Sequence, residues 1–368
     1  NILENVKLST NSPLVKAFHL SGGIDSNLLI SITKKIFPKK KIFTYSSLID
    51  GIKDPEYKYI ESARKIYKSS HTYSILNKEN FFNLYNKALY YLDEPVGDPG
   101  VVAQFLVNKE IAKKFKIVIS GQGSDEMFMG YMRNYLCFLN LKFDLKKEKQ
   151  KKRLNKISSF IQGWENFLSK NIYKNDIKFN YFKNLKRIDY LKDKIFSNLQ
   201  LDLNKQFSSD FNFLDKEIDI LKFMILSETK IQLPSLLHME DRASMAYSLE
   251  SRVPLCTNST LGLSLKSELD WTFKKNLPKG VLRETFKDYL PKMILNRNKK
   301  IGRPVPFKKW LFENKSEFTN FQKNEELVNH VFQKNVFNHL LKNRNAYDRT
   351  LWGVWSLIKF INQKKLTI

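Results

Sequence analysis

Residues 20–26 of the chain read Leu20-Ser21-Gly22-Gly23-Ile24-Asp25-Ser26, and this stretch decides the fold. The apolar run at residues 14–20 predicts a strand before it, and residues 27–36 predict a helix after it. Two adjacent glycines let the backbone turn closely around an anion, and the first N–H groups of a helix donate to phosphate. The sequence therefore predicts a phosphate-binding loop between a strand and a helix.

The loop lacks the Gly-Lys-Ser/Thr ending of a Walker A motif. It instead resembles the PP-loop of ATP pyrophosphatases, which hold the β,γ-pyrophosphate while a nucleophile attacks the α-phosphorus of ATP. The loop alone leaves the substrate open, because synthetases of amides, nucleotides and modified tRNA bases share it. A plain glycine turn between a strand and a helix is the alternative.

A second turn of the same character follows another predicted strand. Residues 116–120 form a short apolar run, and Gly121-Gln122-Gly123-Ser124-Asp125-Glu126 comes directly after it. Ligands of open α/β sheets bind at the carboxyl ends of the strands, so the two turns are expected to face one nucleotide. Magnesium commonly takes one or two carboxylates together with phosphate oxygens. The paired turns therefore predict a magnesium–nucleotide site.

Further motifs make the resemblance specific. Over residues 14–311 the chain resembles the synthetase domain of class B asparagine synthetases, and the two turns at residues 21–26 and 120–131 match that family's signatures. The other matching motifs, in the family's order, are Leu92-Asp93-Glu94-Pro95 with Asp98-Pro99, Leu233-Pro234-Ser235-Leu236-Leu237, Asp241-Arg242-Ala243-Ser244-Met245-Ala246, Glu250-Ser251-Arg252-Val253-Pro254, Lys300-Ile301-Gly302, Pro304-Val305-Pro306 and Trp310-Leu311.

The predicted fold class is α/β. Strand-like and helix-like runs alternate, which is typical of a parallel sheet covered on both faces. The expected strands are 14–20, 41–46, 71–76 and 116–120, and the expected helices are 27–36, 57–67 and 101–114. The resemblance implies a PP-loop ATP pyrophosphatase fold with a mostly helical carboxyl-terminal half. The predicted parts are a nucleotide-binding core at 1–133, a helical insertion at 134–212 and a helical part at 213–368, with a buried helical stripe within 347–362.

The resemblance implies a reaction in two steps. A substrate carboxylate, that of the aspartate side chain in the leading assignment, attacks the α-phosphorus of ATP to give an acyl adenylate and pyrophosphate. Ammonia then displaces AMP, and the product is an amide. The alternatives are an amide-forming relative that acts on another carboxylate in cell-surface sugar or peptide tailoring, a tRNA-modifying PP-loop enzyme, and a catalytically inactive homologue.

The same resemblance assigns roles to individual residues. The residues that hold pyrophosphate are Ser21, Gly22, Gly23 and Ser26. The magnesium ligands are Asp25, Asp125 and Glu126. The residues that border adenosine, mainly through backbone atoms, are Leu20, Tyr45, Ser120 and Gly121. Lys300 matches a lysine late in the family's sequence that neutralises charge on the pentavalent phosphorus. The alternative for Lys300 is a solvated loop lysine, and the alternative for Asp125 is a helix N-cap.

Four departures from the family pattern concern the substrate. Gln122 replaces a glutamate that handles protons of the incoming amine, and an amide cannot act as a general base near neutral pH. Arg303 replaces a phenylalanine, Leu255-Cys256-Thr257 replaces Phe-Leu-Asp, and Asn298 stands where an arginine is usual. These changes predict an altered substrate pocket, with Gln122 in the amine-transfer half.

Composition is that of a globular cytoplasmic enzyme. The 368 residues are 42% hydrophobic, which suffices for a substantial core. Only Cys137 and Cys256 occur, so neither a disulfide framework nor a Cys-x-x-Cys site is expected. No apolar run is long enough to span a bilayer. The net charge of +26 is spread along the chain, so a nucleic-acid partner is not expected.

The expected partners follow from the reaction. Besides the small-molecule carboxylate, the site needs ammonia, which the family takes from an amino-terminal glutaminase domain with a terminal cysteine nucleophile. Neither cysteine lies near a terminus of this sequence, so a glutaminase domain or subunit elsewhere is expected to supply the ammonia. A homodimer is left open.

Overall fold

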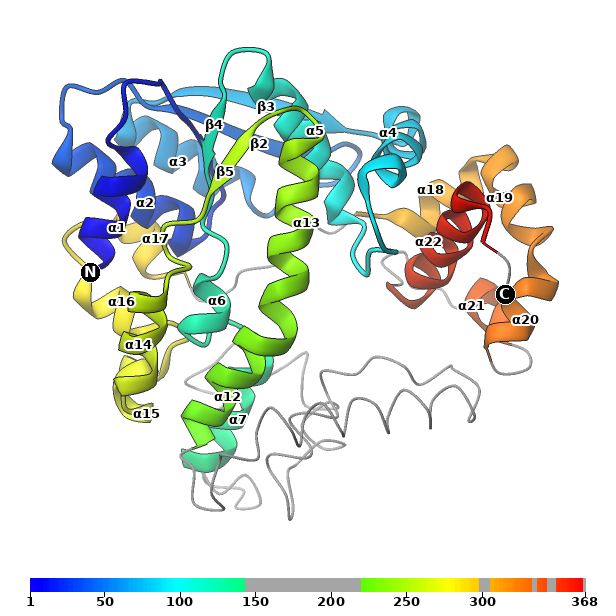
Figure 1. Ribbon diagram of the computed structural model, residues 1–368. Coiled ribbons are helices and arrows are strands. Elements are labelled where there is room, and N and C mark those ends of the chain that lie inside the picture. The colour runs from blue at the N-terminus through cyan, green and yellow to red at the C-terminus, as the bar shows by residue number, and fades with distance from the viewer. Residues whose placement is uncertain (143–219, 298–304, 333–335, 343–348, 367–368) are drawn as a thin grey trace.

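A five-stranded parallel sheet forms the centre of the computed structural model, which describes residues 1–142, 220–297, 305–332, 336–342 and 349–366 (Figure 1). The strand order is β3-β2-β1-β4-β5, and every neighbouring pair is parallel. The strands are β1 Ala17–His19, β2 Phe43–Ile49, β3 Ser70–Leu76, β4 Ile117–Ile119 and β5 Glu250–Arg252. The predicted PP-loop α/β fold is confirmed.

Both faces of the sheet are buried because successive strand residues point to opposite sides. In β4, Ile117 and Ile119 belong to one apolar cluster and Val118 to another. In β1, Phe18 joins the first cluster and Ala17 the second. A strand covered on both faces favours apolar residues at every position, and β4, with the sequence Ile-Val-Ile, is buried throughout.

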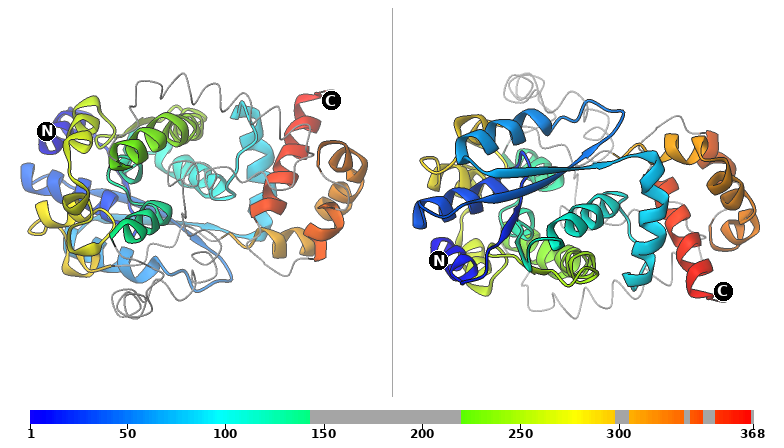
Figure 2. Two further views of the ribbon diagram at one scale, coloured as in Figure 1. Left: turned by 90° about the horizontal axis from the view of Figure 1, so that it is seen from below. Right: turned by 90° about the horizontal axis from the view of Figure 1, so that it is seen from above.

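Helices cover the two faces (Figure 2). On the face of Phe18 lie α1 Ile2–Thr10, α2 Ile24–Ile36, α3 Tyr57–Tyr67 and α17 Lys292–Leu295. Helix α5 Gly100–Ala112 packs on the opposite face through Val107 and Ile111, and α4 Lys78–Tyr91 packs against α5. The two layers leave the carboxyl ends of β1 and β4 as the place where loops meet.

A long helical segment passes beside the sheet. Helix α12 Ile220–Ser227 continues through one π-helical turn, Glu228–Gln232, into α13 Leu233–Met245, which packs against α5 and leads into β5 (Figure 1). Helix α7 Met132–Lys142 lies at the other end of this segment. The remaining elements of this part are α6 Ser124–Met127, α14 Asn258–Lys266, α15 Leu269–Thr272, the 3-10 turn Lys274–Asn276 and α16 Gly280–Thr285.

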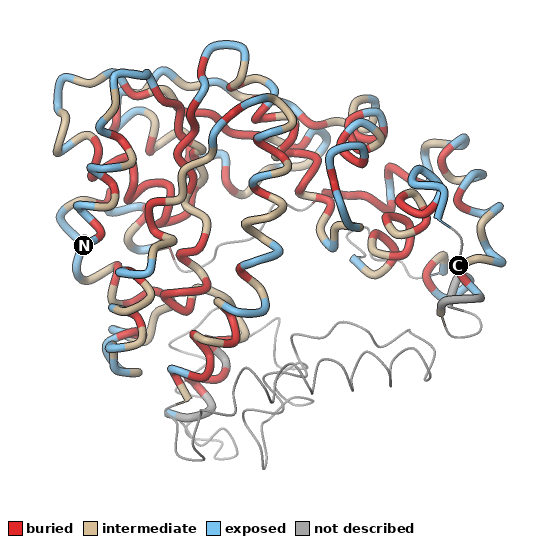
Figure 3. Tube along the Cα trace, in the orientation of Figure 1, coloured by how far each residue is buried: buried red, intermediate tan, exposed pale blue. Residues whose placement is uncertain are grey.

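The carboxyl-terminal helices pack around tryptophans. They are α18 Phe307–Glu313, α19 Lys315–Gln322, α20 Glu325–Val331, α21 Val336–Lys342 and α22 Arg349–Lys364. Trp352 and Trp355 of α22 are fully buried, and their rings lie 4.8 and 5.1 Å from the ring of Tyr85 in α4. The buried stripe expected within residues 347–362 is confirmed, and buried residues follow it along α22 in Figure 3. These tryptophans therefore form core.

Differences from the expected elements are few. Each expected strand and helix is present, although β1 begins only at Ala17, and Leu14 and Val15 before it are exposed. Helices α1 and α4 and strand β5 were not predicted; β5 is short and polar, so its sequence carries no strand pattern. Most of the expected 134–212 insertion lies outside the described residues. Among the described helices, none has both the length and the apolar character that crossing a membrane requires.

Candidate active site

The loop after β1 is held by its own side chains. The Gly23 N–H donates to Ser21 Oγ over 3.1 Å, and the Ser21 N–H donates to Ser26 Oγ over 3.1 Å. From the first turn of α2, the Asn27 amide donates to the carbonyls of Ser21 and Gly23 at 2.9 and 2.7 Å. These bonds fix the turn without any ligand, as an anion-binding loop requires.

A buried ion pair supports the loop from outside. The Gly22 N–H donates to Glu56 Oε2 over 2.8 Å, and the same carboxylate pairs with Arg297, whose guanidinium lies 4.0 Å from the centre of the Tyr59 ring. A Cβ at Gly22 would lie 2.2 Å from Arg297 Nη1. It would also lie 2.6 Å from Tyr59 Cβ, which cannot move aside without the backbone, so glycine is required at this position. Neither Glu56 nor Arg297 was assigned a role from the sequence.

The turn after β4 contacts the first loop directly. A Cβ at Gly121 would lie 2.8 Å from Asp25 Cβ, so only glycine lets the two turns approach so closely. Gly123 has φ of 87°, a left-handed conformation that places Ser124 at the start of α6. The adjacency of β1 and β4 in the sheet thus brings Asp25 and Asp125 together, as the sequence predicted.

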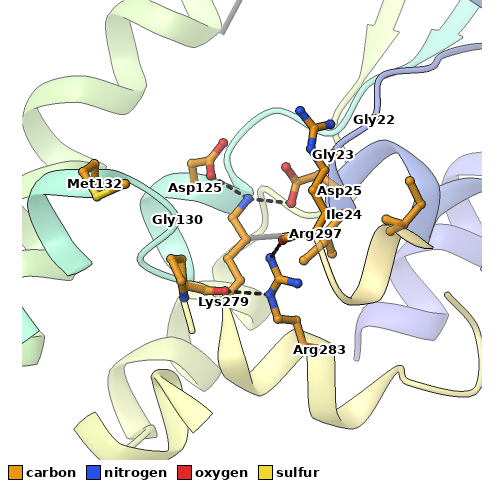
Figure 4. Close-up of a pocket in the computed structure, with 12 residues that line it drawn as sticks. Gly22, Gly23, Ile24, Asp25, Asp125, Gly130, Met132, Lys279, Arg283 and Arg297 are labelled. Carbon is orange, nitrogen blue, oxygen red and sulfur yellow. Dashed lines mark hydrogen bonds and ion pairs between the residues drawn. The ribbon is translucent and has the colours of Figure 1, made fainter. Parts of the chain in front are cut away.

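A lysine lies between these two carboxylates (Figure 4). Lys279 Nζ is 2.6 Å from Asp25 Oδ1 and 2.7 Å from Asp125 Oδ1. Both carboxylates therefore converge on one cation. Two hard oxygen ligands at one point, beside a loop suited to phosphate, fit a magnesium ion that takes its other ligands from phosphate and water. Lys279 carries no motif signal, and the sequence analysis missed it.

Glu126 lies apart from this pair. Its carboxylate accepts a hydrogen bond from the Tyr131 hydroxyl beneath α6, and it lines neither of the two cavities described here. Burial, together with the neighbouring Asp125 charge, raises the pKa of Glu126 to about 7. The predicted role of Glu126 as a third magnesium ligand stays a prediction.

Two adjoining cavities share Asp25 and Asp125. The first, shown in Figure 4, contains the phosphate-side groups, and its charged lining residues are Asp25, Asp125, Lys279, Arg283 and Arg297. Burial lowers the pKa of Arg283 to about 10, which still leaves its guanidinium charged at neutral pH. Cations of three separate side chains thus surround the two carboxylates and the PP-loop glycines.

The second cavity, of about 250 Å³, contains the predicted adenosine-side residues and a polar wall. Leu20, Ser120, Gly121 and Gln122 line it. It is also lined by polar side chains from β1, α5 and α13, which are His19, Gln104 and Glu240. Glu240 is 5% exposed, accepts from Ser251 Oγ over 2.7 Å and from the Gln104 amide, and has His19 Nδ1 3.9 Å away.

The remaining predicted residues have different positions. Tyr45 is buried in the apolar cluster against Phe115, and its carbonyl accepts from the Leu20 N–H over 2.9 Å, so it contacts the loop only through its backbone. Cys256, from the departing Leu255-Cys256-Thr257 triplet, packs against Gly123 under the second turn. Lys300, with Asn298 and Arg303, lies outside the described residues.

Known proteins resemble the chain over most of its length. A family model described as asparagine synthase matches residues 4–362. Asparagine synthetase [glutamine-hydrolyzing] 1 of Bacillus subtilis is 26% identical over 365 residues, which are 96% of this chain and 57% of that protein. A putative asparagine synthetase [glutamine-hydrolyzing] of Mycobacterium bovis is 26% identical over 79% of this chain and 45% of its own length. The chain spans about half the length of these relatives.

Proposed function

The chain belongs to the asparagine synthase family, and from this premise we propose that it makes an amide from a carboxylate, using ATP and releasing AMP and pyrophosphate. The leading assignment is the side-chain carboxylate of aspartate with ammonia, which gives asparagine. The observation that carries the proposal is the convergence of Asp25 and Asp125 on one cation beside the PP-loop glycines.

The phosphate-side residues would act by position and charge. Gly22 and Gly23 of the loop and the first residues of α2 line the cavity where we place the pyrophosphate, and Arg283 and Arg297 line the same cavity. Magnesium, when bound by Asp25 and Asp125, would neutralise charge on the phosphates. Because an anionic carboxylate must approach a polyanion, this concentration of positive charge is what attack at the α-phosphorus requires. Lys300 would add to it, as the resemblance implies.

In the second cavity, called the polar cavity below, we place the adenosine beside Leu20, Ser120 and Gly121, and the carboxylate and the amine beside Gln122, Gln104 and Glu240. Gln122 follows the adenosine-side Ser120-Gly121 and precedes Asp125, so it lies between the two halves of the site. Its amide cannot take a proton from an attacking amine. Glu240 is a carboxylate in the same cavity, and we assign the proton acceptor role to it. His19, 3.9 Å from Glu240, would hold that carboxylate in place.

A second candidate is an amide-forming relative that acts on a different carboxylate. Gln122 favours it, because the amide at this position changes the amine half of the site while leaving the phosphate half intact. In both candidates ammonia from a glutaminase domain or subunit, a cytoplasmic location and a homodimer stay predictions. The phosphate chemistry is the same in both.

The test is ATP–pyrophosphate exchange across a panel of carboxylates. We expect one carboxylate to stimulate magnesium-dependent exchange of labelled pyrophosphate into ATP, with aspartate first on the panel. Exchange with another carboxylate alone would select the second candidate. Hydrolysis to ADP and phosphate, with no exchange for any carboxylate, would contradict the proposal.

A further inference from the structure

Lys279 occupies the position at which a metal ion would bind. Its Nζ contacts Asp25 Oδ1 and Asp125 Oδ1 at 2.6 and 2.7 Å, and Ser124 Oγ lies 3.3 Å away. The residue is 5% exposed, so water can do little to solvate its charge. The two carboxylates therefore serve as its solvation shell.

The surrounding backbone is shaped to hold this lysine. Lys279 itself has φ of 56° and ψ of 34°, a left-handed conformation that costs a non-glycine residue free energy unless its surroundings stabilise it. A Cβ at Gly130 would lie 1.9 Å from Asp125 Oδ1 and 2.2 Å from Lys279 Cε. Glycine at position 130 therefore leaves the space that the ion pair fills.

Magnesium and the Lys279 ammonium group compete for the same two carboxylate oxygens. Magnesium bound to the same two oxygens would lie about 2.1 Å from each, so it and the ammonium could not both remain there. Without nucleotide, the displaced ammonium would lose two carboxylate partners inside a buried site, which is strongly unfavourable. The phosphates of ATP would supply new anionic partners in the cavity that Lys279 lines with Arg283 and Arg297.

We propose that Lys279 is a resident counter-ion that keeps free divalent cations out of the site and releases Asp25 and Asp125 only when ATP phosphates arrive. Magnesium and nucleotide then bind as a unit, and Lys279 moves from the carboxylates to the phosphates. This inference rests on the proposed function in one respect, the placement of the polyphosphate at Gly22 and Gly23.

Manganese binding, followed by the electron paramagnetic resonance signal of free Mn²⁺, tests the proposal without any turnover. The nucleotide analogue α,β-methylene-ATP itself binds Mn²⁺, so each mixture is compared with the same mixture without protein. We expect the unaltered protein to bind additional Mn²⁺ at this site only when the analogue is present. Lys279→Met should bind one Mn²⁺ without nucleotide, about tenfold or more tighter than the unaltered protein, because two buried carboxylates then lack a cation. The double variant Lys279→Met with Asp125→Asn should lose the gained affinity.

Lys275→Met is the matched control, since Lys275 lies four residues away, is exposed and pairs with Glu284. It should behave as the unaltered protein does. Equal Mn²⁺ affinity of the unaltered protein with and without nucleotide would overturn the proposal, and this measurement needs no variant that folds. So would a folded Lys279→Met protein that binds Mn²⁺ no more tightly. Pyrophosphate exchange by the unaltered protein reports separately on the proposed function.

Discussion

The two adjoining cavities are built in different ways. The phosphate side is made of opposite charges already paired in the protein: Asp25 and Asp125 with Lys279, and Glu56 with Arg297. Beyond the shared Asp25 and Asp125, the polar cavity adds two amides, of Gln122 and Gln104, and the carboxylate of Glu240. Charges fixed before the ligand arrives suit a polyanion whose chemistry does not vary. The amide side chains of the polar cavity can be substituted to suit a different substrate without changing the residues that serve adenylation.

The largest expected effect lies on the phosphate side. Asp25→Asn and Asp125→Asn should each lower ATP–pyrophosphate exchange by roughly 1,000-fold, because each removes a charge that stabilises the reacting phosphates by several kcal/mol. Circular dichroism checks that the fold is kept. The exposed Asp288, changed to Asn, is the control and should exchange normally. Near-normal exchange in either site variant would remove that residue from the metal site.

The next largest effect is expected from the ion pair between Glu56 and Arg297, which supports the PP-loop. Glu56→Gln leaves Arg297 buried without its carboxylate, and the free energy of unfolding should fall by about 3 kcal/mol or more. Glu61→Gln weakens the more exposed pair with Arg64 and keeps an acceptor for the Tyr73 hydroxyl, so it should lower stability clearly less. Urea unfolding of both variants measures the difference. Equal losses would mean that Glu56 does not tie Arg297 to the loop.

A smaller and more selective effect is expected in the polar cavity. Glu240→Gln should lower the rate of amide formation about 100-fold while pyrophosphate exchange stays within about twofold, because a general base contributes about that much. Ser251→Ala is the control, since it removes a hydrogen bond to Glu240 and keeps the carboxylate. Equal slowing of both half-reactions by Glu240→Gln would assign this residue a structural role.

The smallest effect concerns Gln122. Gln122→Glu should leave pyrophosphate exchange within about threefold and change the pH dependence of amide formation, since a carboxylate there can accept a proton and the amide cannot. The measurement is the yield of amide as a function of pH, from about pH 6 to about pH 9, for both proteins. A loss of thermal stability with unchanged kinetics would mean that Gln122 only supports the turn.

The sequence predicted those parts of the site that depend on local spacing. Asp25 and Asp125 each lie in the turn that follows one of two neighbouring strands, so sheet geometry brings them together. Lys279 and Arg297 come from segments that are distant in sequence: Lys279 is 254 residues from Asp25, and Arg297 is 241 from Glu56. Only the packing of the complete fold joins such residues. Lys279 in its Pro-Lys-Gly turn looks like an ordinary loop lysine.

The same distinction applies to the fold. The strands and helices of the sheet region were predicted because their apolar residues recur in the sequence at the spacing of a buried strand or of one helix face. Strand β5 was missed because its three residues are polar. Its position in the sheet depends instead on its pairing with β4 and on the position of α13, which precedes it. This strand matters for the polar cavity, since its Ser251 donates to Glu240.

Attack of a carboxylate on the α-phosphorus is the central claim, and oxygen-isotope transfer measures it directly. The protein would be incubated with magnesium, ATP, ammonium and the carboxylate that stimulates exchange, labelled with ¹⁸O in its carboxyl group. We predict that the label appears in the phosphate of AMP, with unlabelled pyrophosphate, because the bond to the α-phosphorus forms through the carboxylate oxygen. Label in inorganic phosphate, with ADP as the nucleotide product, would contradict the account.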